Sequence, residues 1–387
     1  MRIYICPALM DWIVFLLLFA VLYGAGERHM TTAQCAWLGG IFQLMYMFAS
    51  LAVGSALTRR NARAMLIAST VIFTILSILC LMLKSFWPLL VMMGVLGITL
   101  ATFFNAFQTF MRGEAAPGKL TRAVGLYTLA WSLGSGLGVF SSGLCYQFGV
   151  LALSGLTALV GLTVLVILLL YRSKPVHETS ADEEVDRSSS RPVNPSYVWI
   201  GWIIIFTAMF VQRPLQTFFP SLSAQSGISP FLAGFPLALH MILQGIMGYN
   251  LYPLRNLLYR KTSLLVFQGS AALLFFLIWL RPSLAGCFIG ISLLGIYTGF
   301  AYYAAVFYSS NSGRRSFNIG INECLVGLGS FAGLFAVEGW MKYSGDVHAM
   351  YLIGGLVLLV SIVLQLTIAR LGQRKALPEH AGESSCR

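Results

Sequence analysis

The sequence predicts an all-α integral membrane protein with twelve transmembrane helices in two parallel six-helix repeats, both termini cytoplasmic. Three observations predict this fold: the composition, the apolar runs, and a repeat at an offset of 195 residues, as between Gly125 and Gly320. Hydrophobic residues make up 58% of the 387 residues and charged residues 10%. The mean hydropathy is +0.80, which lies outside the usage of soluble domains.

Twelve apolar runs are each long enough to cross a bilayer, because a hydrocarbon core of about 30 Å needs about 20 helical residues. Internal glycines and the lack of strict alternation favour helices over a β-barrel. In chain order, the predicted helices cover residues 6–24, 34–57, 64–84, 87–111, 123–146, 149–171, 197–219, 231–252, 262–281, 285–309, 317–341 and 349–369.

The distribution of Lys and Arg predicts the orientation. Of 25 such residues, one, Arg213, lies inside a helix, and four lie in connections on one side, at Arg28, Lys84, Arg281 and Lys342. The other twenty fall at the termini and in connections on the opposite side, which we therefore expect to be cytoplasmic. Loop cations that face anionic lipid also account for the net charge of +12 without a nucleic-acid partner.

The chain divides into two halves around a polar segment. Residues 177–195, HETSADEEVDRSSSRPVNP, are acidic and rich in Ser and Pro, which is typical of a solvated linker. We expect a six-helix half at residues 1–171, a cytoplasmic linker at 172–196, a second half at 197–370 and a cytoplasmic tail at 371–387.

A glycine pattern is present in both halves. The segment GLYTLAWSLGSGLG, which begins at Gly125, matches GINECLVGLGSFAG, which begins at Gly320. Gly134 and Gly138 align with Gly329 and Gly333 at the same offset. Small residues let helices approach closely in lipid, so the pattern predicts tight helix packing in each half.

Two motifs and the duplication resemble a known family. The segment GSALTRRNAR is similar to the G-x-L-A-D-R-x-G-R-K loop of the major facilitator superfamily through Gly54, Arg59 and Arg63. Thr58 replaces the family's Asp, and Asn61 replaces its Gly. The resemblance covers nearly the whole chain and implies a transporter of two parallel repeats that works by alternating access. The helix at 123–146 is also similar to the glycine signature of drug antiporters, with Val139 in place of the proline.

Polar residues form a stripe on the fourth predicted helix, at Thr99, Thr102, Asn105, Gln108, Thr109 and Arg112. Such a face is costly against lipid, so we expect it to line a cavity. The equivalent positions in the tenth helix are aromatic: Tyr297, Phe300, Tyr303 and Phe307. Together they suggest a substrate pathway between an amide wall and an aromatic wall; the alternative is ordinary interhelical packing.

Ionisable residues inside the predicted helices are few and therefore candidates for function. Arg213 is a candidate for an anionic group or an outer gate, and Asp11, His240 and Glu323 are candidates for coupling. A buried His is also commonly a neutral, hydrogen-bonded core residue. For Glu323 we expect a latch to Arg59, Arg60 or Arg63 that closes the cytoplasmic gate; a local contact with Arg314 or Arg315 is the alternative.

The sequence has no phosphate loop, no metal-ligand spacing and no nucleophile motif, so we expect neither an enzyme nor a cofactor or metal. It predicts a multi-pass protein of the cytoplasmic membrane that carries a small organic solute. Proton coupling, direction and substrate stay open. The alternatives are an efflux antiporter for drugs or metabolites and a receptor or scaffold built on a transporter fold. We expect a monomer in the bilayer.

Overall fold

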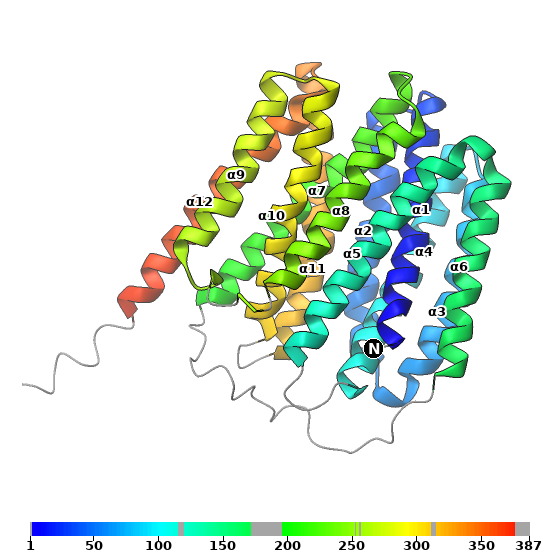
Figure 1. The fold of residues 1–387 in the computed structure, drawn as a ribbon, viewed down its shortest axis with the longest axis horizontal. Helices are drawn as coiled ribbons and strands as arrows, with labels where there is room; N and C mark the ends of the chain where they lie inside the picture. The colour runs from blue at the N-terminus through cyan, green and yellow to red at the C-terminus, as the bar shows by residue number, and fades with distance from the viewer. Residues whose placement is uncertain are drawn as a thin grey trace, which may run out of the picture.

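The structure is a computed structural model that describes residues 2–114, 120–171, 196–251, 253–254, 257–310 and 315–375. Within these ranges the chain forms twelve α-helices and two 3-10 helices, with no β-strand (Figure 1). The helices are η1 (Arg2–Tyr4), α1 (Ile5–Glu27), α2 (Thr32–Ala56), α3 (Arg59–Met82), α4 (Phe86–Glu114), α5 (Leu120–Cys145), η2 (Tyr146–Phe148), α6 (Val150–Leu170), α7 (Ser196–Gln225), α8 (Pro230–Asn250), α9 (Lys261–Leu280), α10 (Leu284–Ser310), α11 (Arg315–Ser344) and α12 (Ala349–Lys375).

Each α-helix coincides with one predicted apolar run, and the predicted all-α membrane fold is confirmed. In the described part of the chain, eleven of the helices are long and apolar enough to span a membrane. The remaining one, α5, holds five Gly and four Ser among its 26 residues, which lower its hydropathy. The orientation of the termini stays a prediction.

The packing of α1–α6 is repeated by α7–α12. Helix α1 packs on α5, α2 on α4, and α3 on α6; six helices later, α7 packs on α11, α8 on α10, and α9 on α12. Between the two sets, α2 packs on α11 and α5 on α8, and these two contacts are related by the same shift. Helices α1 and α7 meet at the centre. Residues 172–195 of the predicted linker and most of the predicted tail lie outside the described residues, and α7 begins at Ser196, the last residue of the predicted linker.

The duplicated glycines make the expected close contacts. A Cβ at Gly134 or Gly138 of α5 would overlap the carbonyl oxygens of Ala8 and Trp12 in α1. A Cβ at their counterparts in α11, Gly329 or Gly333, would likewise overlap the carbonyl oxygen of Phe206 or Phe210 in α7. The packing role predicted for this pattern is confirmed in both halves, and it brings α1 and α7 into place beside the centre of the molecule.

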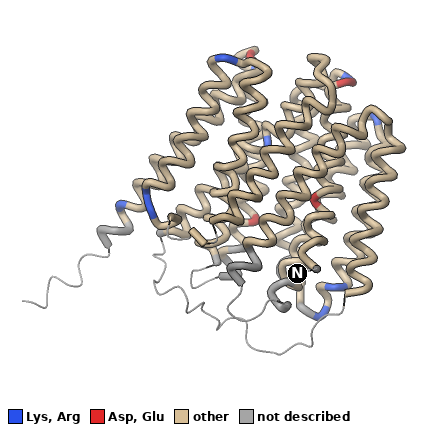
Figure 2. Tube along the Cα trace, in the orientation of Figure 1, with Lys and Arg blue, Asp and Glu red and all other residues tan. Residues whose placement is uncertain are grey.

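The two sets of helices are joined tightly at the end opposite the N-terminus. There the Tyr23 hydroxyl donates to the Ile228 carbonyl oxygen at 2.7 Å, and Gln225 Nε2 donates to the Met30 carbonyl oxygen at 3.2 Å. A Cβ at Gly26 would overlap the carbonyl oxygen of Ser221. Figure 2 shows charged residues mainly at the two ends of the bundle, with both signs also present inside it.

Candidate functional site

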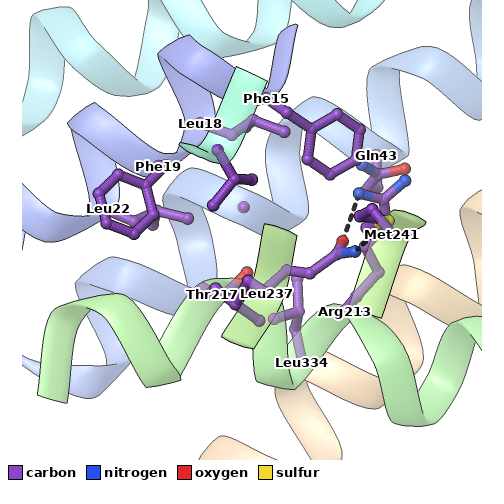
Figure 3. Close-up of a pocket in the computed structure, with 13 residues that line it drawn as sticks. Phe15, Leu18, Phe19, Leu22, Gln43, Arg213, Thr217, Leu237, Met241 and Leu334 are labelled. Atoms are coloured by element: carbon purple, nitrogen blue, oxygen red, sulfur yellow. Dashed lines mark hydrogen bonds between the residues drawn. The ribbon is translucent and has the colours of Figure 1, made fainter. Parts of the chain in front are cut away.

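A pocket lies on the central axis between the two sets of helices. Its lining comes from α1, α2 and α5 and from their repeat counterparts α7, α8 and α11. In Figure 3, Phe15, Leu18, Phe19 and Leu22 of α1 form one side, and Thr217, Leu237 and Leu334 lie across from them. Repeat-related positions differ here, since Leu18 and Leu22 correspond to Arg213 and Thr217. The pocket is therefore apolar on the α1 side and polar on the α7 side.

Arg213 is the charged residue of this pocket. Its Nη1 donates to Gln216 Oε1 at 2.8 Å, and its guanidinium carbon lies 5.7 Å from the centroid of the Phe15 ring. Its Nε is buried and has no hydrogen-bond partner among the described residues. A buried donor without a partner is uncommon, because leaving it unsatisfied costs roughly 1–3 kcal/mol.

A polar and aromatic cluster continues from the pocket toward the end of the bundle where α1 begins. We call this the central cluster and define it as Asp11, Tyr46, Tyr127, Trp131, Arg213, Tyr302 and Glu323. The cluster and the pocket lie on the same helix faces. Asp11 of the cluster precedes the pocket residue Phe15 by one turn of α1, and Tyr46 follows the pocket residue Gln43 by three residues of α2. Six helices, three from each half, contribute to it.

Direct contacts hold the cluster together across the two halves. The Tyr46 hydroxyl donates to Glu323 Oε2 at 3.4 Å, which joins α2 to α11. The rings of Trp131 and Tyr302 meet edge to face at 4.9 Å, which joins α5 to α10. The Tyr302 hydroxyl also contacts Met209 Sδ at 3.0 Å.

Asp11 is the most deeply placed acid of the cluster, with 6% of its surface exposed. It interacts electrostatically with Arg213, Tyr46, Tyr127 and Tyr302. No described residue donates a hydrogen bond to its carboxylate, and it forms no direct salt bridge with Arg213. Asp11 is thus a buried carboxylate whose ordinary partners are absent from the described part of the protein.

Of the polar residues predicted on α4, Gln108 is the one whose contact with the central cluster is shown among the described residues. Gln108 forms a side-chain hydrogen bond with Tyr127, so it adjoins the cluster directly. Asn105 Nδ2 donates to Ser50 Oγ of α2 at 3.2 Å and to the Ala101 carbonyl oxygen at 2.8 Å. The Thr102 hydroxyl donates to the Ile98 carbonyl oxygen of its own helix at 3.0 Å.

The aromatic residues predicted on α10 lie in packed positions, and the structure does not bring them into the central cluster. Phe300 is fully buried and stacks on Phe267 of α9 at 4.4 Å. Tyr303 is 1% exposed and stacks on Phe307 at 6.2 Å, and Tyr297 is 2% exposed. The α10 residue that reaches the cluster is Tyr302, one position from Tyr303.

His240 lies in a buried hydrogen-bond network of its own. Its Nδ1 is 2.8 Å from the Ile291 carbonyl oxygen, and its Nε2 is 3.1 Å from Gln212 Nε2 and 3.2 Å from Thr298 Oγ1. Donation from Nδ1 and acceptance at Nε2 satisfy a neutral imidazole. The network reaches the other half through Gln244, whose Nε2 donates to Ser132 Oγ at 3.2 Å.

The loop after α2 forms a capping box. The Thr58 amide donates to Asn61 Oδ1 at 2.8 Å, the Asn61 amide donates to Thr58 Oγ1 at 3.4 Å, and α3 begins between them. Arg63 Nη2 donates to the carbonyl oxygens of Leu168 and Leu169 at 3.2 and 3.1 Å, at the end of α6. Gly54 lies in α2 and Arg59 begins α3, and the side chain of Arg59 lies outside the described part.

Sequence reasoning missed Tyr46, Tyr127, Trp131 and Tyr302. Tyr127 and Trp131 are four residues apart and so share a helix face, but nothing local distinguishes that face from one that packs against lipid. The described residues contain no group of three His, Cys, Asp or Glu side chains able to hold a metal ion.

Two comparisons with known proteins bear on this arrangement. A family profile described as the Major Facilitator Superfamily matches residues 3–333. A search of curated proteins gives no match.

Proposed function

The chain belongs to the major facilitator superfamily, and from this premise we propose that it carries a small organic solute across its membrane by alternating access, with the central cluster as the binding site. The observation that carries the proposal is the position of the charges. Asp11, Arg213 and Glu323 lie inside helices, where each charge costs at least about 2.5 kcal/mol, yet all three interact electrostatically with Tyr302, whose ring contacts Trp131 across the two halves.

The packing supports a path that opens at one end at a time. Contacts such as those of Tyr23 and Gly26 close the end opposite the N-terminus, and the pocket lies between these contacts and the central cluster. Rocking of one half against the other would break these contacts and expose the same cluster to the opposite side. We assign Thr102, Asn105, Gln108 and Arg213 to this path. On α10, Tyr302 takes the aromatic role that the sequence predicted for Tyr297, Phe300 and Tyr303.

Coupling to protons, if it operates, is assigned to Asp11 and Glu323 rather than to His240. A proton on either carboxylate changes the charge of the cluster itself. Neutral His240 is already satisfied, because its Nδ1 donates to the Ile291 carbonyl oxygen and its Nε2 accepts, and it lies outside the central cluster. The superfamily's gate loop is retained in Gly54, Arg59 and Arg63, and the latch between this loop and Glu323 belongs to the state that is closed at the predicted cytoplasmic end.

Access from both sides distinguishes a transporter from a receptor or scaffold without knowledge of the solute. Leu18, which lines the pocket, is replaced by Cys in a protein whose native cysteines are changed to Ala. A membrane-impermeant thiol reagent is then applied to each face of reconstituted vesicles. A transporter exposes Leu18→Cys to both faces in turn, whereas a receptor exposes it to one face.

Leu16→Cys is the matched control on the same helix. Leu16 is fully buried and belongs to a cluster with Ala20 and Leu153 on the α6 side of α1. It should stay unreactive from both faces. Equal labelling of both positions would mean that the reagent enters by unfolding, and one-sided labelling of Leu18→Cys would reject transport.

A further inference from the structure

The buried charges of Asp11 and Arg213 balance one another. The carboxylate and the guanidinium interact electrostatically, but no salt bridge joins them, so their charged atoms lie more than 4.0 Å apart. Glu323 has partners of its own, since it accepts from the Tyr46 hydroxyl and makes a further contact. The interior of a membrane protein has a low effective dielectric, so a bound ion would leave a costly uncompensated charge there. The balance therefore favours a solute without net charge.

Asp11 and Arg213 also have hydrogen-bonding atoms without partners. Only 6% of the Asp11 surface is exposed, and no described residue donates a hydrogen bond to its carboxylate. Arg213 Nη1 donates to Gln216 Oε1 at 2.8 Å, whereas Arg213 Nε is buried and has no acceptor among the described residues. Buried polar groups are normally hydrogen-bonded, because each has given up its bonds to water. The two residues thus call for a ligand that donates to the carboxylate and accepts from the guanidinium.

The two residues lie beside the same apolar surface. The guanidinium carbon of Arg213 is 5.7 Å from the centroid of the Phe15 ring, and Asp11 precedes Phe15 by one turn of α1. Phe15 and Leu18 continue from there along one side of the pocket, as Figure 3 shows. A ligand held between Asp11 and Arg213 would therefore meet polar groups at one end and apolar side chains at the other.

An uncharged hydroxyl or amide supplies both missing partners. Each of these groups has a donor and an acceptor, whereas an ammonium group only donates and a carboxylate only accepts. Moving such a group out of water also costs far less than moving an ion. A zwitterion offers both functions too, but both of its charges must be desolvated.

We propose that the solute of this protein is an uncharged organic molecule whose hydroxyl or amide bridges Asp11 and Arg213 and whose apolar part lies against Phe15 and Leu18. This assignment rests on the proposed function, because it names the chemical class of the solute for the same site.

Thiol reagents of different charge measure the charge of the site. Leu18→Cys, in the purified full chain with its native cysteines changed to Ala, is reacted with hydroxyethyl, sulfonatoethyl and trimethylammonioethyl methanethiosulfonate, which are neutral, anionic and cationic. Each rate is divided by the rate of the same reagent with mercaptoethanol in solution. We expect the anion and the cation to be slowed to a similar extent relative to the neutral reagent. A preference of roughly tenfold or more for either ion would overturn the proposal, because it would reveal a net charge.

Substitutions should break this balance in opposite directions. Asp11→Asn leaves the guanidinium unbalanced and should raise the anion-to-cation rate ratio roughly tenfold or more, and Arg213→Gln should lower it by a similar factor. The double variant, which carries an amide at both positions and remains balanced, should return the ratio to its original value. Glu338→Gln, near the end of α11, is the control and should leave the ratio unchanged. A ratio that neither single substitution changes would overturn the role of Asp11 and Arg213.

Ligands of one carbon skeleton and different charge test the solute class. The uncharged 4-methylpentanamide and 4-methylpentan-1-ol are compared with the anion 4-methylpentanoate, the cation 4-methylpentylammonium and the zwitterion leucine, and methyl glucoside adds further hydroxyls. The measurement is the rate at which the neutral reagent labels Leu18→Cys. We expect at least one uncharged compound to slow the labelling and the ions to have no effect, and Asp11→Leu, which cannot accept a hydrogen bond, to abolish this protection. Protection by the anion or the cation, stronger protection by leucine, or no protection by any uncharged compound would overturn the assignment.

The outcome is separable from that of the transport test. Two-sided access to Leu18→Cys without protection by an uncharged compound would leave transport standing and reject the solute class. Protection by an uncharged compound with one-sided access would make the protein a receptor for uncharged ligands and reject transport.

Discussion

Thr58 and Asn61 stand where the superfamily signature of the loop after α2 has Asp and Gly. In the structure each side chain accepts from the other residue's amide, so together they start α3. Asn61 Nδ2 also donates to the Ala56 carbonyl oxygen at 3.2 Å, at the end of α2. The residues that replace the signature's Asp and Gly therefore fix the turn between two helices, and Asp at position 58 would serve equally well as an N-cap.

This gives a prediction for stability. Thr58→Ala should lower the free energy of unfolding by about 1 kcal/mol, because α3 loses its N-cap, while Thr58→Asp should leave it unchanged. Denaturant titration of the purified protein in detergent measures both.

Thr163→Ala is the control, because the Thr163 hydroxyl donates only to the Leu159 carbonyl oxygen of its own helix, at 2.8 Å on an exposed face. If Thr58→Ala changed the free energy of unfolding as little as Thr163→Ala does, the capping box of Thr58 and Asn61 would contribute nothing to stability.

At the scale of the element, α5 and α11 depend on glycines for their position. Both helices carry the same pair, and both pairs bring a neighbouring helix to backbone contact. Since the pattern serves packing in each half, it does not by itself indicate the antiporter branch of the family. It also explains the lower hydropathy of α5, whose glycines pack on α1 and α8 rather than on lipid.

Gly134→Ala should therefore destabilise the protein by about 1–3 kcal/mol, because the added methyl group overlaps the Ala8 carbonyl oxygen and the helices must separate. Gly329→Ala, at the equivalent position against Phe206, should cost a similar amount. Unfolding temperature and yield of folded protein are the measurements.

Gly155→Ala in α6 is the reference, since a Cβ there meets nothing within 4 Å. It should be neutral or slightly stabilising, because Ala has the higher helix propensity. A loss in Gly155→Ala as large as in the other two variants would contradict the explanation by close packing.

At the scale of the whole molecule, the helix order places the connections containing Lys84 and Arg281 at the end opposite the N-terminus. The charge distribution predicts that this end faces away from the cytoplasm. The pocket and the contacts of Tyr23 and Gly26 then lie between the central cluster and the outer side of the membrane.

The orientation can be measured in intact cells. Ser85→Cys, in the connection before α4, should react with an impermeant thiol reagent from outside, and Ser188→Cys, which lies outside the described residues, should react only after the cells are opened. The reverse pattern would invert the molecule in the membrane.

The sequence by itself determined the number of helices, the approximate position of each helix, the duplication and the packing role of the glycines. These follow from local rules: the bilayer demands about 20 apolar residues per span, and close approach of two helices demands small side chains. The same rules identified Asp11, Arg213 and Glu323 as unusual, because charge inside a span is conspicuous in any context.

Only the tertiary structure decided which faces meet at the axis. Tyr302 and Tyr303 are adjacent in the chain and turned about 100° apart, and one reaches the cluster while the other stacks on Phe307. Glu323 meets Tyr46, which lies 277 residues away. A helical period tells which residues share a face but not which neighbour that face meets, because the rotation of each helix is set by its packing against the others.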